Sequence, residues 1–327
     1  MNPLVAVITP TKNRLKLLCE AMDSVRRQSF EAWEHIVVDD GSDDGTAEEV
    51  TRRAETDPRI RYIKRSGDKS GANVCRNLGI RQSRADFIVL LDSDDLLSPH
   101  CLARRIEALE RNRDLDFAVF PGCVFTKTIG DYGRLFSPVT IGSDLDRFLL
   151  LDHPWEITGP IWRRTALEKL GLFSEQIPSW QDVDLHVRAL VAGAKYLKFD
   201  VPDHHIRWQH DLTKTSALQF QSHGHLESGM VTVQTFYRLL SQAGLVSWYR
   251  RRALGGLIFL LAERWTRDGR LLKGLRVWFS AYREGFTPLL LYWIGLCVLI
   301  VYRLKIFVPA YNERFLERFK AAVGFRV

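Results

Sequence analysis

Short apolar runs alternate with amphipathic segments over the first 120 residues. Each run has the length and composition of a β-strand, and Leu15, Leu18, Met22 and Val25 recur at helical spacing behind the first run. Strands that alternate with helices indicate right-handed crossovers and a mostly parallel sheet with both faces covered. The predicted strands are Leu4–Thr9, Glu34–Asp40, Ile60–Arg65, Phe87–Asp92 and Leu115–Pro121, and later helices are predicted at about 73–82 and 99–111.

Polar and acidic residues gather directly after three of these strands, in Thr9–Arg14, Asp39–Asp44 and Asp92–Asp95. Ligands of such sheets bind beyond the carboxyl ends of the strands. A turn or a helix cap accounts for any one of the three segments. Together they predict a binding site at one rim of the sheet.

The segment "LLDSDD" places Asp92, Asp94 and Asp95 at the end of an apolar run. Two unit charges about 4 Å apart repel by roughly 4 kcal/mol at an effective dielectric near 20. Hard divalent cations such as magnesium or manganese favour carboxylate oxygens and relieve this repulsion. A strand followed by a polar turn and a helix cap is the alternative, and this segment alone leaves both open.

Composition and cysteine usage narrow the class of protein. The 327 residues are 46% hydrophobic and 26% charged, which predicts one large globular domain or two smaller ones and excludes widespread disorder. The residues after Met1 form a short strand and a loop, so we expect no signal peptide. Five scattered cysteines without a C-x-x-C pair predict reduced thiols in a cytoplasmic protein, and argue against zinc or disulfides.

The positive charge is concentrated at the end of the chain. The net charge is +7, and residues 250–327 contain fifteen Lys and Arg against five Asp and Glu. Aromatic residues such as Trp248, Trp278 and Trp293 accompany them. Basic and aromatic residues together are typical of a membrane interface, so we expect an anionic membrane surface as a partner and no nucleic acid.

Two segments of this region carry the membrane prediction. In one helix, the apolar stripe is predicted to contain Leu271, Leu275, Trp278, Phe279 and Tyr282. The next segment, from 286 to 302, has seventeen residues without a charge, and this length is the lower limit for a bilayer span. The segment also includes a proline. We favour an interfacial or re-entrant hairpin. A full crossing stays open, as does a soluble helical subdomain that buries the stripe against the rest of the protein.

Four segments together resemble a known family. "VITPTKNR", "IVVDDGSDDGT", "RNLGIRQSRADFIVLLDSDD" and "WQDVDLHVRAL" are similar, in order and spacing, to the signatures of family 2 glycosyltransferases. The resemblance covers Val5 to Ser216 and implies a nucleotide-sugar-dependent, inverting enzyme with the α/β GT-A fold. It implies a catalytic domain over 1–215, with a nucleotide-sugar half of about 1–120 and an acceptor half of about 121–215. Residues 216–327 then form a helical, membrane-associating extension.

The resemblance implies a role for five residues on the nucleotide side. Asp40 would accept hydrogen bonds from the uracil of a UDP-sugar, since an ionised carboxylate is an acceptor only. Pro10 and Thr11 would line the nucleotide pocket and Arg14 its edge, while Arg76 would approach the diphosphate. The alternative for Asp40 is an Asx-turn that leads into the glycine after it.

"LDSDD" resembles the D-x-D motif of the family. The resemblance implies that Asp94 binds Mn²⁺ or Mg²⁺, that Asp92 reaches the ribose or a water on the metal, and that Ser93 belongs to the nucleotide-sugar site. Asp95 would brace the loop. The looser segment "RWQHDLTKTS" implies His210 as a further contact of the metal or the diphosphate, although a lone histidine after a strand is more often structural.

"WQDVDLHVRAL" carries the remaining chemistry of the resemblance. The family has an acidic pair here, whose aspartate is the general base, and Asp182 holds that place. Gln181 replaces the other acid of the pair. Asp184 and Arg188 stand at i,i+4 on the predicted helix. The alternative is an Asp182 that only caps this helix.

Two tryptophans and two histidines nearby have weaker signals. Trp155 and Trp162 precede the predicted base, where an exposed indole could stack on an acceptor sugar, although core packing is expected for at least one of them. His204 and His205 match no metal-binding spacing and predict no special role.

The residues and the resemblance together predict an inverting glycosyltransferase. It would transfer a sugar from a UDP-sugar to a hydroxyl of a saccharide or lipid-linked saccharide, in the assembly of a bacterial-type cell-surface polysaccharide or glycolipid. We expect it at the cytoplasmic face of the membrane, as a peripheral or monotopic protein. A nucleotidyltransferase is disfavoured because "TPTKNRL" lacks glycine. A non-catalytic nucleotide- or membrane-binding scaffold is the other alternative, although this chain keeps Asp182 and the D-x-D acids.

Overall fold

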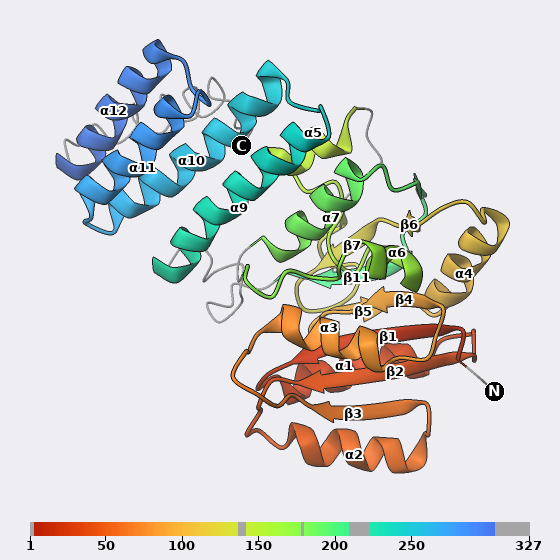
Figure 1. Cartoon of the computed structure of the whole chain (residues 1–327). Helices are drawn as coiled ribbons and strands as arrows, with labels where there is room; N and C mark the ends of the chain where they lie inside the picture. Colours follow the sequence, from red (N-terminus) through yellow and green to blue (C-terminus); the bar gives the residue numbers. More distant parts are fainter. Residues whose placement is uncertain (1–2, 137–141, 178–179, 209–222, 305–327) are drawn as a thin grey trace. The chain divides into compact units, whose positions relative to one another are not determined.

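The computed structural model describes residues 3–136, 142–177, 180–208 and 223–304, with side chains up to residue 300 (Figure 1). The chain divides into two compact units. The first comprises Met1–Ile141, His153–Glu175 and Gly193–His210, and the second comprises Gly142–Asp152, Gln176–Ala192 and Asp211–Val327. The boundary predicted at residue 215 lies outside the described residues.

A seven-stranded sheet forms the centre of the first unit, in the order β10-β6-β9-β4-β1-β2-β3 (Figure 1). Its strands pair in parallel except β9, which runs antiparallel between β4 and β6. The strands are β1 (Val5–Thr11), β2 (Trp33–Asp39), β3 (Ile60–Lys64), β4 (Phe87–Leu90), β6 (Phe117–Val119), β9 (Pro160–Arg163) and β10 (Tyr196–Lys198). The prediction of an α/β fold with a mostly parallel sheet is confirmed.

Alternation along the central strands places apolar side chains on both faces of this sheet. Val5, Val7 and Val37 belong to one core cluster, which also holds side chains from the helices α1 (Leu15–Arg26), α2 (Thr46–Thr56) and α4 (Cys101–Arg111). Ile36 and Val38 belong to a second cluster with Cys75, which lies on the helix α3. Both faces are therefore covered, as expected for parallel strands linked by helical crossovers.

The helices of the first unit follow the strands in the predicted alternation. They are α1 (Leu15–Arg26), α2 (Thr46–Thr56), α3 (Ala72–Gln82), α4 (Cys101–Arg111) and α6 (Arg164–Lys169). The N-terminus of α1 is capped from a distant loop, because the Leu15 backbone N–H donates to Asp44 (2.9 Å). This cap joins two of the polar loops that follow the central strands, and it leaves Asn13 to accept instead from the Asp43 backbone N–H.

The antiparallel strand β9 was not anticipated. Trp162 and Trp155 on either side of its start are both fully buried, and Phe117 stacks on Trp162 with 4.1 Å between ring centroids. Neither indole is therefore available to stack on an acceptor sugar. Both tryptophans belong to the core, so packing, and not stacking on a sugar, is their role.

A smaller sheet of four strands completes the first unit, in the order β5-β11-β7-β8. Its strands are β5 (Leu96–Leu97), β7 (Gly122–Phe125), β8 (Arg134–Leu135) and β11 (His204–Arg207). β11 pairs antiparallel with β5, directly after the acidic loop, and parallel with β7. This pairing brings chain from beyond residue 200 beside the acidic loop.

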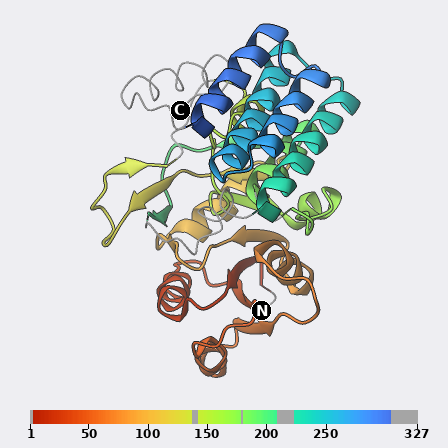
Figure 2. The same ribbon diagram turned by 90° about the vertical axis from the view of Figure 1, so that its left-hand side faces the viewer.

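The second unit is helical. Its described helices are α5 (Asp144–Leu149), α7 (Gln181–Val191), α9 (His223–Gln242), α10 (Trp248–Arg267), α11 (Leu271–Arg283) and α12 (Leu289–Leu304). α9, α10, α11 and α12 pack side by side (Figure 2). Glycines set the close approaches, since a Cβ on Gly274 of α11 would lie 2.6 Å from the Ala262 carbonyl oxygen of α10. The helical extension after the catalytic signatures is thus present.

The apolar stripe predicted on α11 is divided by the structure. Trp278 is fully buried, and its indole N–H donates to the Tyr292 carbonyl (2.9 Å). Phe279 and Tyr282 are instead exposed to 47% and 38%. The buried face of α11 packs against small residues of the neighbouring helices. The 3.6-residue period of the sequence does not by itself show which part of the stripe is buried.

Membrane-spanning helices are not found among the described residues. The uncharged segment 286–302 overlaps α12, which begins at Leu289 directly after Pro288 and has 16 residues.

The packing of α3 against β1 predicts opposite effects for two glycine substitutions. A Cβ on Gly79 would lie 2.5 Å from Cγ2 of the buried Ile8, a β-branched side chain with little freedom to turn. We expect Gly79→Ala to destabilise the protein by about 1–3 kcal/mol, as overpacked cores do. Gly224 in the first turn of α9 has open space around it among the described residues, so Gly224→Ala should gain a few tenths of a kcal/mol, roughly, from helix propensity.

Urea denaturation of both variants measures the difference. A Gly79→Ala midpoint at or above that of the native chain contradicts the predicted packing.

Candidate active site

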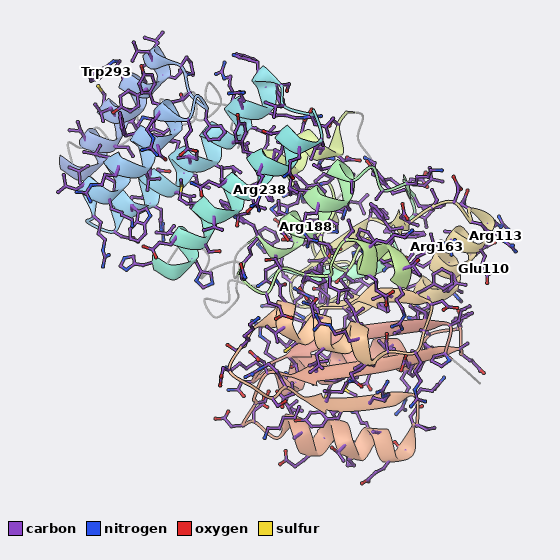
Figure 3. All side chains as sticks on the ribbon, in the orientation of Figure 1. Glu110, Arg113, Arg163, Arg188, Arg238 and Trp293 are labelled. Carbon is purple, nitrogen blue, oxygen red and sulfur yellow. The ribbon has the colours of Figure 1, made fainter. Side chains whose placement is uncertain are left out.

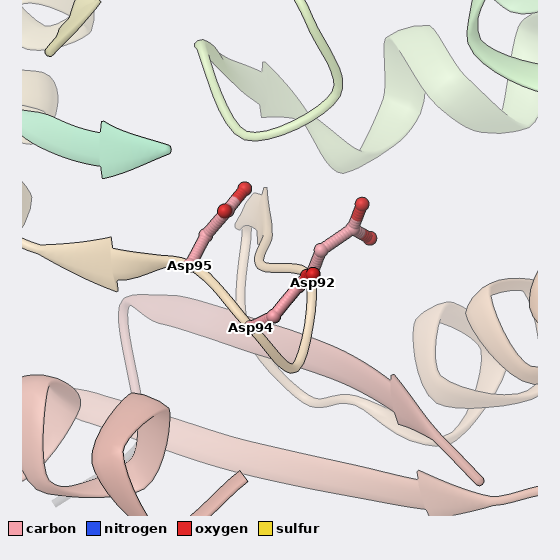
Figure 4. Close-up of side chains that lie close together, drawn as sticks. All are labelled: Asp92, Asp94 and Asp95. Atoms are coloured by element: carbon pink, nitrogen blue, oxygen red, sulfur yellow. The ribbon is translucent and has the colours of Figure 1, made fainter. Parts of the chain in front are cut away.

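Three carboxylates meet on the loop between β4 and β5 (Figure 4). Asp92, Asp94 and Asp95 each offer one oxygen within 4.8 Å of the others. Asp94 and Asp95 are 6% and 5% exposed, whereas the side chain of Asp92 is 36% exposed. The acidic loop predicted from the sequence is therefore a compact cluster rather than a solvated turn.

Arginines from three separate elements contact this cluster. Arg76 of α3 donates to Asp92 (2.7 Å), and Arg14, just before α1, donates to Asp94 (3.3 Å). Arg207 of β11 donates its backbone N–H to the Asp95 carboxylate and its Nε to the Asp94 carbonyl, both at 3.0 Å. The structure thus brings Arg14, Arg76, Asp92 and Asp94 together, as the sequence predicts.

The cluster stays electrostatically unfavourable despite these arginines. Burial, Asp94 and Asp92 raise the pKa of Asp95 well above its usual value. Burial also raises the pKa of Asp92, against the lowering effect of Arg76. Closely spaced carboxylate oxygens whose charged forms are disfavoured fit a divalent cation, which supplies the missing positive charge.

Asp40 lies directly after β2, at the same edge of the sheet as the acidic loop. It is 9% exposed, and its carboxylate accepts from Arg65 Nε and from the Gly71 backbone N–H (3.0 Å). Each carboxylate oxygen has a second lone-pair site, so these contacts position Asp40 and leave acceptor capacity. The preceding Asp39 is engaged structurally, since it accepts from Tyr62 Oη (2.8 Å).

The other predicted nucleotide residues lie at the end of β1 and in the acidic loop. Pro10 and Thr11 are buried at the end of β1, where Thr11 pairs in register with Asp39. The hydroxyl of Thr11 is buried and has no hydrogen-bond partner among the described residues, which suits a ligand contact. Ser93 is 5% exposed.

Sequence reasoning missed a buried network beside the acidic loop. Arg105 and Asp203 form an ion pair (2.7 Å) with both side chains fully buried, and Asp203 also contacts His204 (3.0 Å). His204 Nε2 lies 2.6 Å from Glu156, whose charge contributes to the raised pKa of Asp92 and Asp95. Although burial alone lowers it, Glu156 and Asp203 raise the pKa of His204.

The network has little signal in the sequence. Its members come from three distant segments, and only "PDHH", which runs into β11, hints at it.

The predicted base belongs to the second unit. Asp182 is half-buried in the first turn of α7, whereas Asp184 is 1% exposed and contacts Arg188 (2.9 Å). The helix is capped at Trp180, with φ 54°, so Asp182 is not its N-cap. A positive φ is uncommon for a residue with a side chain and recurs at functional sites. His210 lies outside the described residues, and its role stays a prediction.

A family model and curated relatives match the chain. The model described as glycosyl transferase family 2 matches residues 6–171. An uncharacterized glycosyltransferase, MJ1057, of Methanocaldococcus jannaschii is 28% identical over 212 residues, which cover 62% of this chain and 72% of the relative. The GalNAc(5)-diNAcBac-PP-undecaprenol beta-1,3-glucosyltransferase of Campylobacter jejuni is 35% identical over 136 residues, or 41% of this chain. The match spans less than half of that enzyme, 42%.

Solved structures share the fold at low sequence identity. S. aureus TarS 1-349 in complex with UDP-GlcNAc has a TM-score of 0.64 and 16% identity, covering 98% of this chain and 91% of that one. The mannosyltransferase PcManGT from Pyrobaculum calidifontis, in complex with GDP-Man and Mn²⁺, has a TM-score of 0.55 and 18% identity. The match covers 99% of this chain and 86% of the mannosyltransferase chain.

The crowded carboxylates predict that removing one of their charges raises the melting temperature but weakens the stabilisation by a divalent cation. Asp95→Asn removes a charge whose pKa is raised but keeps an oxygen for the Arg207 backbone N–H. A raised carboxylate pKa destabilises the fold only as the pH rises above the ordinary value, where the unfolded chain releases its proton first. We therefore expect a higher melting temperature than native at pH 7 without divalent cations, and no such gain near pH 3.

Mn²⁺ should in turn stabilise the variant less than the native chain. Calorimetry at both pH values, with and without Mn²⁺, measures both effects. A variant that melts below the native chain at pH 7 in chelator would show that Asp95 is not held under repulsion.

Proposed function

Because the chain belongs to glycosyl transferase family 2, we propose that it transfers a sugar from a UDP-sugar to an acceptor hydroxyl with inversion at the anomeric carbon. One observation supports the proposal most: the cluster of Asp92, Asp94 and Asp95 lies at the carboxyl end of β4 and is contacted by Arg14 and Arg76. Carboxylates that hold a cation beside arginine side chains suit the diphosphate of a nucleotide sugar.

On the nucleotide side, Asp40 accepts from the uracil N–H and Thr11 contacts the nucleoside. The support is the placement of Asp40 by Arg65 and Gly71, together with the buried Thr11 hydroxyl that lacks a partner among the described residues. A carboxylate held in this way needs no reorganisation when the uracil ring binds.

Asp94, with Asp92, holds Mn²⁺ or Mg²⁺ in this proposal. The cation supplies Lewis-acid neutralisation of the departing diphosphate. Arg76 contributes a second positive charge on the same side, because its guanidinium contacts Asp92 and the residue is 6% exposed. Arg14 plays the matching part beside Asp94.

Asp182 is the proposed general base. It takes the proton of the acceptor hydroxyl as that oxygen attacks the anomeric carbon, and the bond from this carbon to the diphosphate breaks in the same step. The departing oxygen keeps the bonding electron pair. One in-line displacement inverts the configuration, and no covalent enzyme intermediate forms.

The acceptor is proposed to be a saccharide or a lipid-linked saccharide in cell-surface polysaccharide or glycolipid assembly. Relatives support this class by name: one acts on an undecaprenol-linked saccharide, and a Bacillus subtilis relative is a putative teichuronic acid biosynthesis glycosyltransferase. Such an acceptor fits the further proposal that the enzyme works at the cytoplasmic face of an anionic membrane. Exposed aromatic and apolar residues on α11 and α12 support that location.

The metal proposal predicts coupled binding of cation and nucleotide. We expect UDP to bind the native chain at least about tenfold more tightly with Mn²⁺ than without it, because Asp94 and Asp92 would hold the cation and it would supply positive charge for the diphosphate. Asp94→Asn should lose this gain and keep the weaker affinity seen in chelator. Calorimetric titration of four samples, native and variant with and without Mn²⁺, measures it. Equal UDP affinity in all four samples would contradict the proposed metal role of Asp94.

The base proposal predicts that neighbouring aspartates separate catalysis from stability. Asp182→Asn should lower turnover at least about a hundredfold, as loss of a general base does, with melting temperature and UDP affinity close to native. Asp184→Asn is the matched control: burial raises the pKa of this carboxyl despite Arg188, so removing its charge should leave the melting temperature at pH 7 at or above that of the native chain. Its turnover per folded molecule should stay within about tenfold of native, since it lacks the base role.

Initial rates with a UDP-sugar panel, beside thermal melts, test both variants. Near-native turnover in Asp182→Asn would place the base elsewhere.

A further inference from the structure

A cavity of about 500 Å³ lies in the second unit, between the start of α10 and the turn that joins α11 to α12. Three arginines line it, Arg251 and Arg252 from α10 and Arg283 from the end of α11. Trp248 and Tyr282 add aromatic walls. The cavity belongs to none of the segments that resemble a sugar-nucleotide signature.

Among the residues that the structure describes, little negative charge compensates the arginines of this cavity. None of its lining residues is acidic. Arg252 lies over the Trp248 ring, 4.6 Å from the centroid, and Arg251 lies 5.4 Å from that of Tyr237. Glu284 approaches only Arg283, at 3.6 Å. Arg250 differs, because its Nε contacts Asp146 at 2.6 Å and it does not line the cavity.

A buried hydroxyl adds an independent sign of a ligand. Thr287 lines the same cavity and is 6% exposed. Its Oγ1 is buried and has no hydrogen-bond partner among the described residues. A buried donor of this kind usually has a partner, and an anionic oxygen in the cavity would supply one.

An exposed apolar face adjoins the cavity. On α11 it comprises Leu272, Phe279 and Tyr282, and on α12 it comprises Leu290, Trp293 and Ile300. Tyr292 joins the two helices, with its ring centroid 5.0 Å from that of Tyr282 and 5.7 Å from that of Trp293. Trp293 lies on the outer side of α12 (Figure 3). Tyr282 belongs to both the apolar face and the cavity wall.

We infer that this cavity binds the phosphate of an anionic lipid headgroup, with the acyl chains lying along the apolar face. Arg251, Arg252 and Arg283 neutralise the phosphate, and Thr287 donates to one of its oxygens. The adjoining apolar face selects a lipid, because a soluble phosphate or a nucleic acid leaves exposed leucine and tryptophan uncovered. The inference deepens the membrane association proposed above and rests on it, but not on the catalytic role of any residue.

Vesicle binding of the full-length chain tests the inference. The vesicles are phosphatidylcholine alone, or with about one part in five of phosphatidylglycerol. Each basic residue at an anionic surface contributes about 1 kcal/mol, or about fivefold, so R251Q/R252Q/R283Q should bind the anionic vesicles about a hundredfold more weakly than native. The control R238Q/R270Q/R276Q removes the same charge from exposed arginines outside the cavity. It should lose no more than about tenfold.

Equal loss in the two triple variants would show diffuse charge attraction and overturn the specific site, while membrane association would stand. No binding of the native chain to anionic vesicles would overturn the membrane proposal itself. Melting temperatures show that each variant is folded. Thr287→Val preserves shape and charge, and a weakened binding in this variant supports the cavity, whereas unchanged binding contradicts the role of its hydroxyl.

Soluble glycerol phosphate distinguishes the source of the phosphate. At millimolar concentration it should leave vesicle binding within about twofold of native, because it cannot use the apolar face. Displacement of the protein from the vesicles at that concentration would instead show a site for free phosphate and overturn the choice of lipid.

Discussion

Carboxylates that share the end of a buried strand repel one another, and the first unit is arranged around the need to neutralise them. Asp92, Asp94 and Asp95 receive contacts from residues before α1, on α3 and on β11. Elements separated by more than a hundred residues in the chain therefore converge on one loop. The remaining strain appears as the raised pKa of Asp95. A site that stays short of positive charge after all its arginines fits the divalent cation proposed above.

The same constraint explains why the loop is buried rather than solvated. Arg207 binds backbone and side-chain atoms of the loop through its own N–H and guanidinium, and β5, directly after the loop, pairs with β11. The loop cannot open toward water without breaking this small sheet. Glu156 adds another negative charge nearby, and His204 and Arg105 balance it within a buried network. The acidic loop is thus flanked by a second group of charged residues, which are paired with one another.

The second unit carries both the proposed general base and the proposed lipid site in one helical body. α7, which carries the proposed base, packs against α5 and α9, and Phe148 of α5 stacks on His186 of α7 with 5.1 Å between centroids. α10 in turn contacts α5, where Arg250 pairs with Asp146. Removing the C-terminal helices would therefore disturb the surroundings of Asp182. Point variants on the exposed surfaces of α10 to α12 separate membrane contact from catalysis more cleanly than truncation.

The sequence alone determined the alternation of the five main strands with helices in the first 120 residues, β5 excepted, because apolar period and polar strand ends are local properties. It also identified the acidic loop, Arg14 and Arg76, which the structure brings together. Only the tertiary structure decided what depends on distant partners. It inserted the short antiparallel β9, buried Trp155 and Trp162, divided the α11 stripe at Trp278, and joined Glu156, His204, Asp203 and Arg105. A four-residue strand or a lone charged residue carries too little local pattern to predict, since its environment is set by chain that arrives from elsewhere.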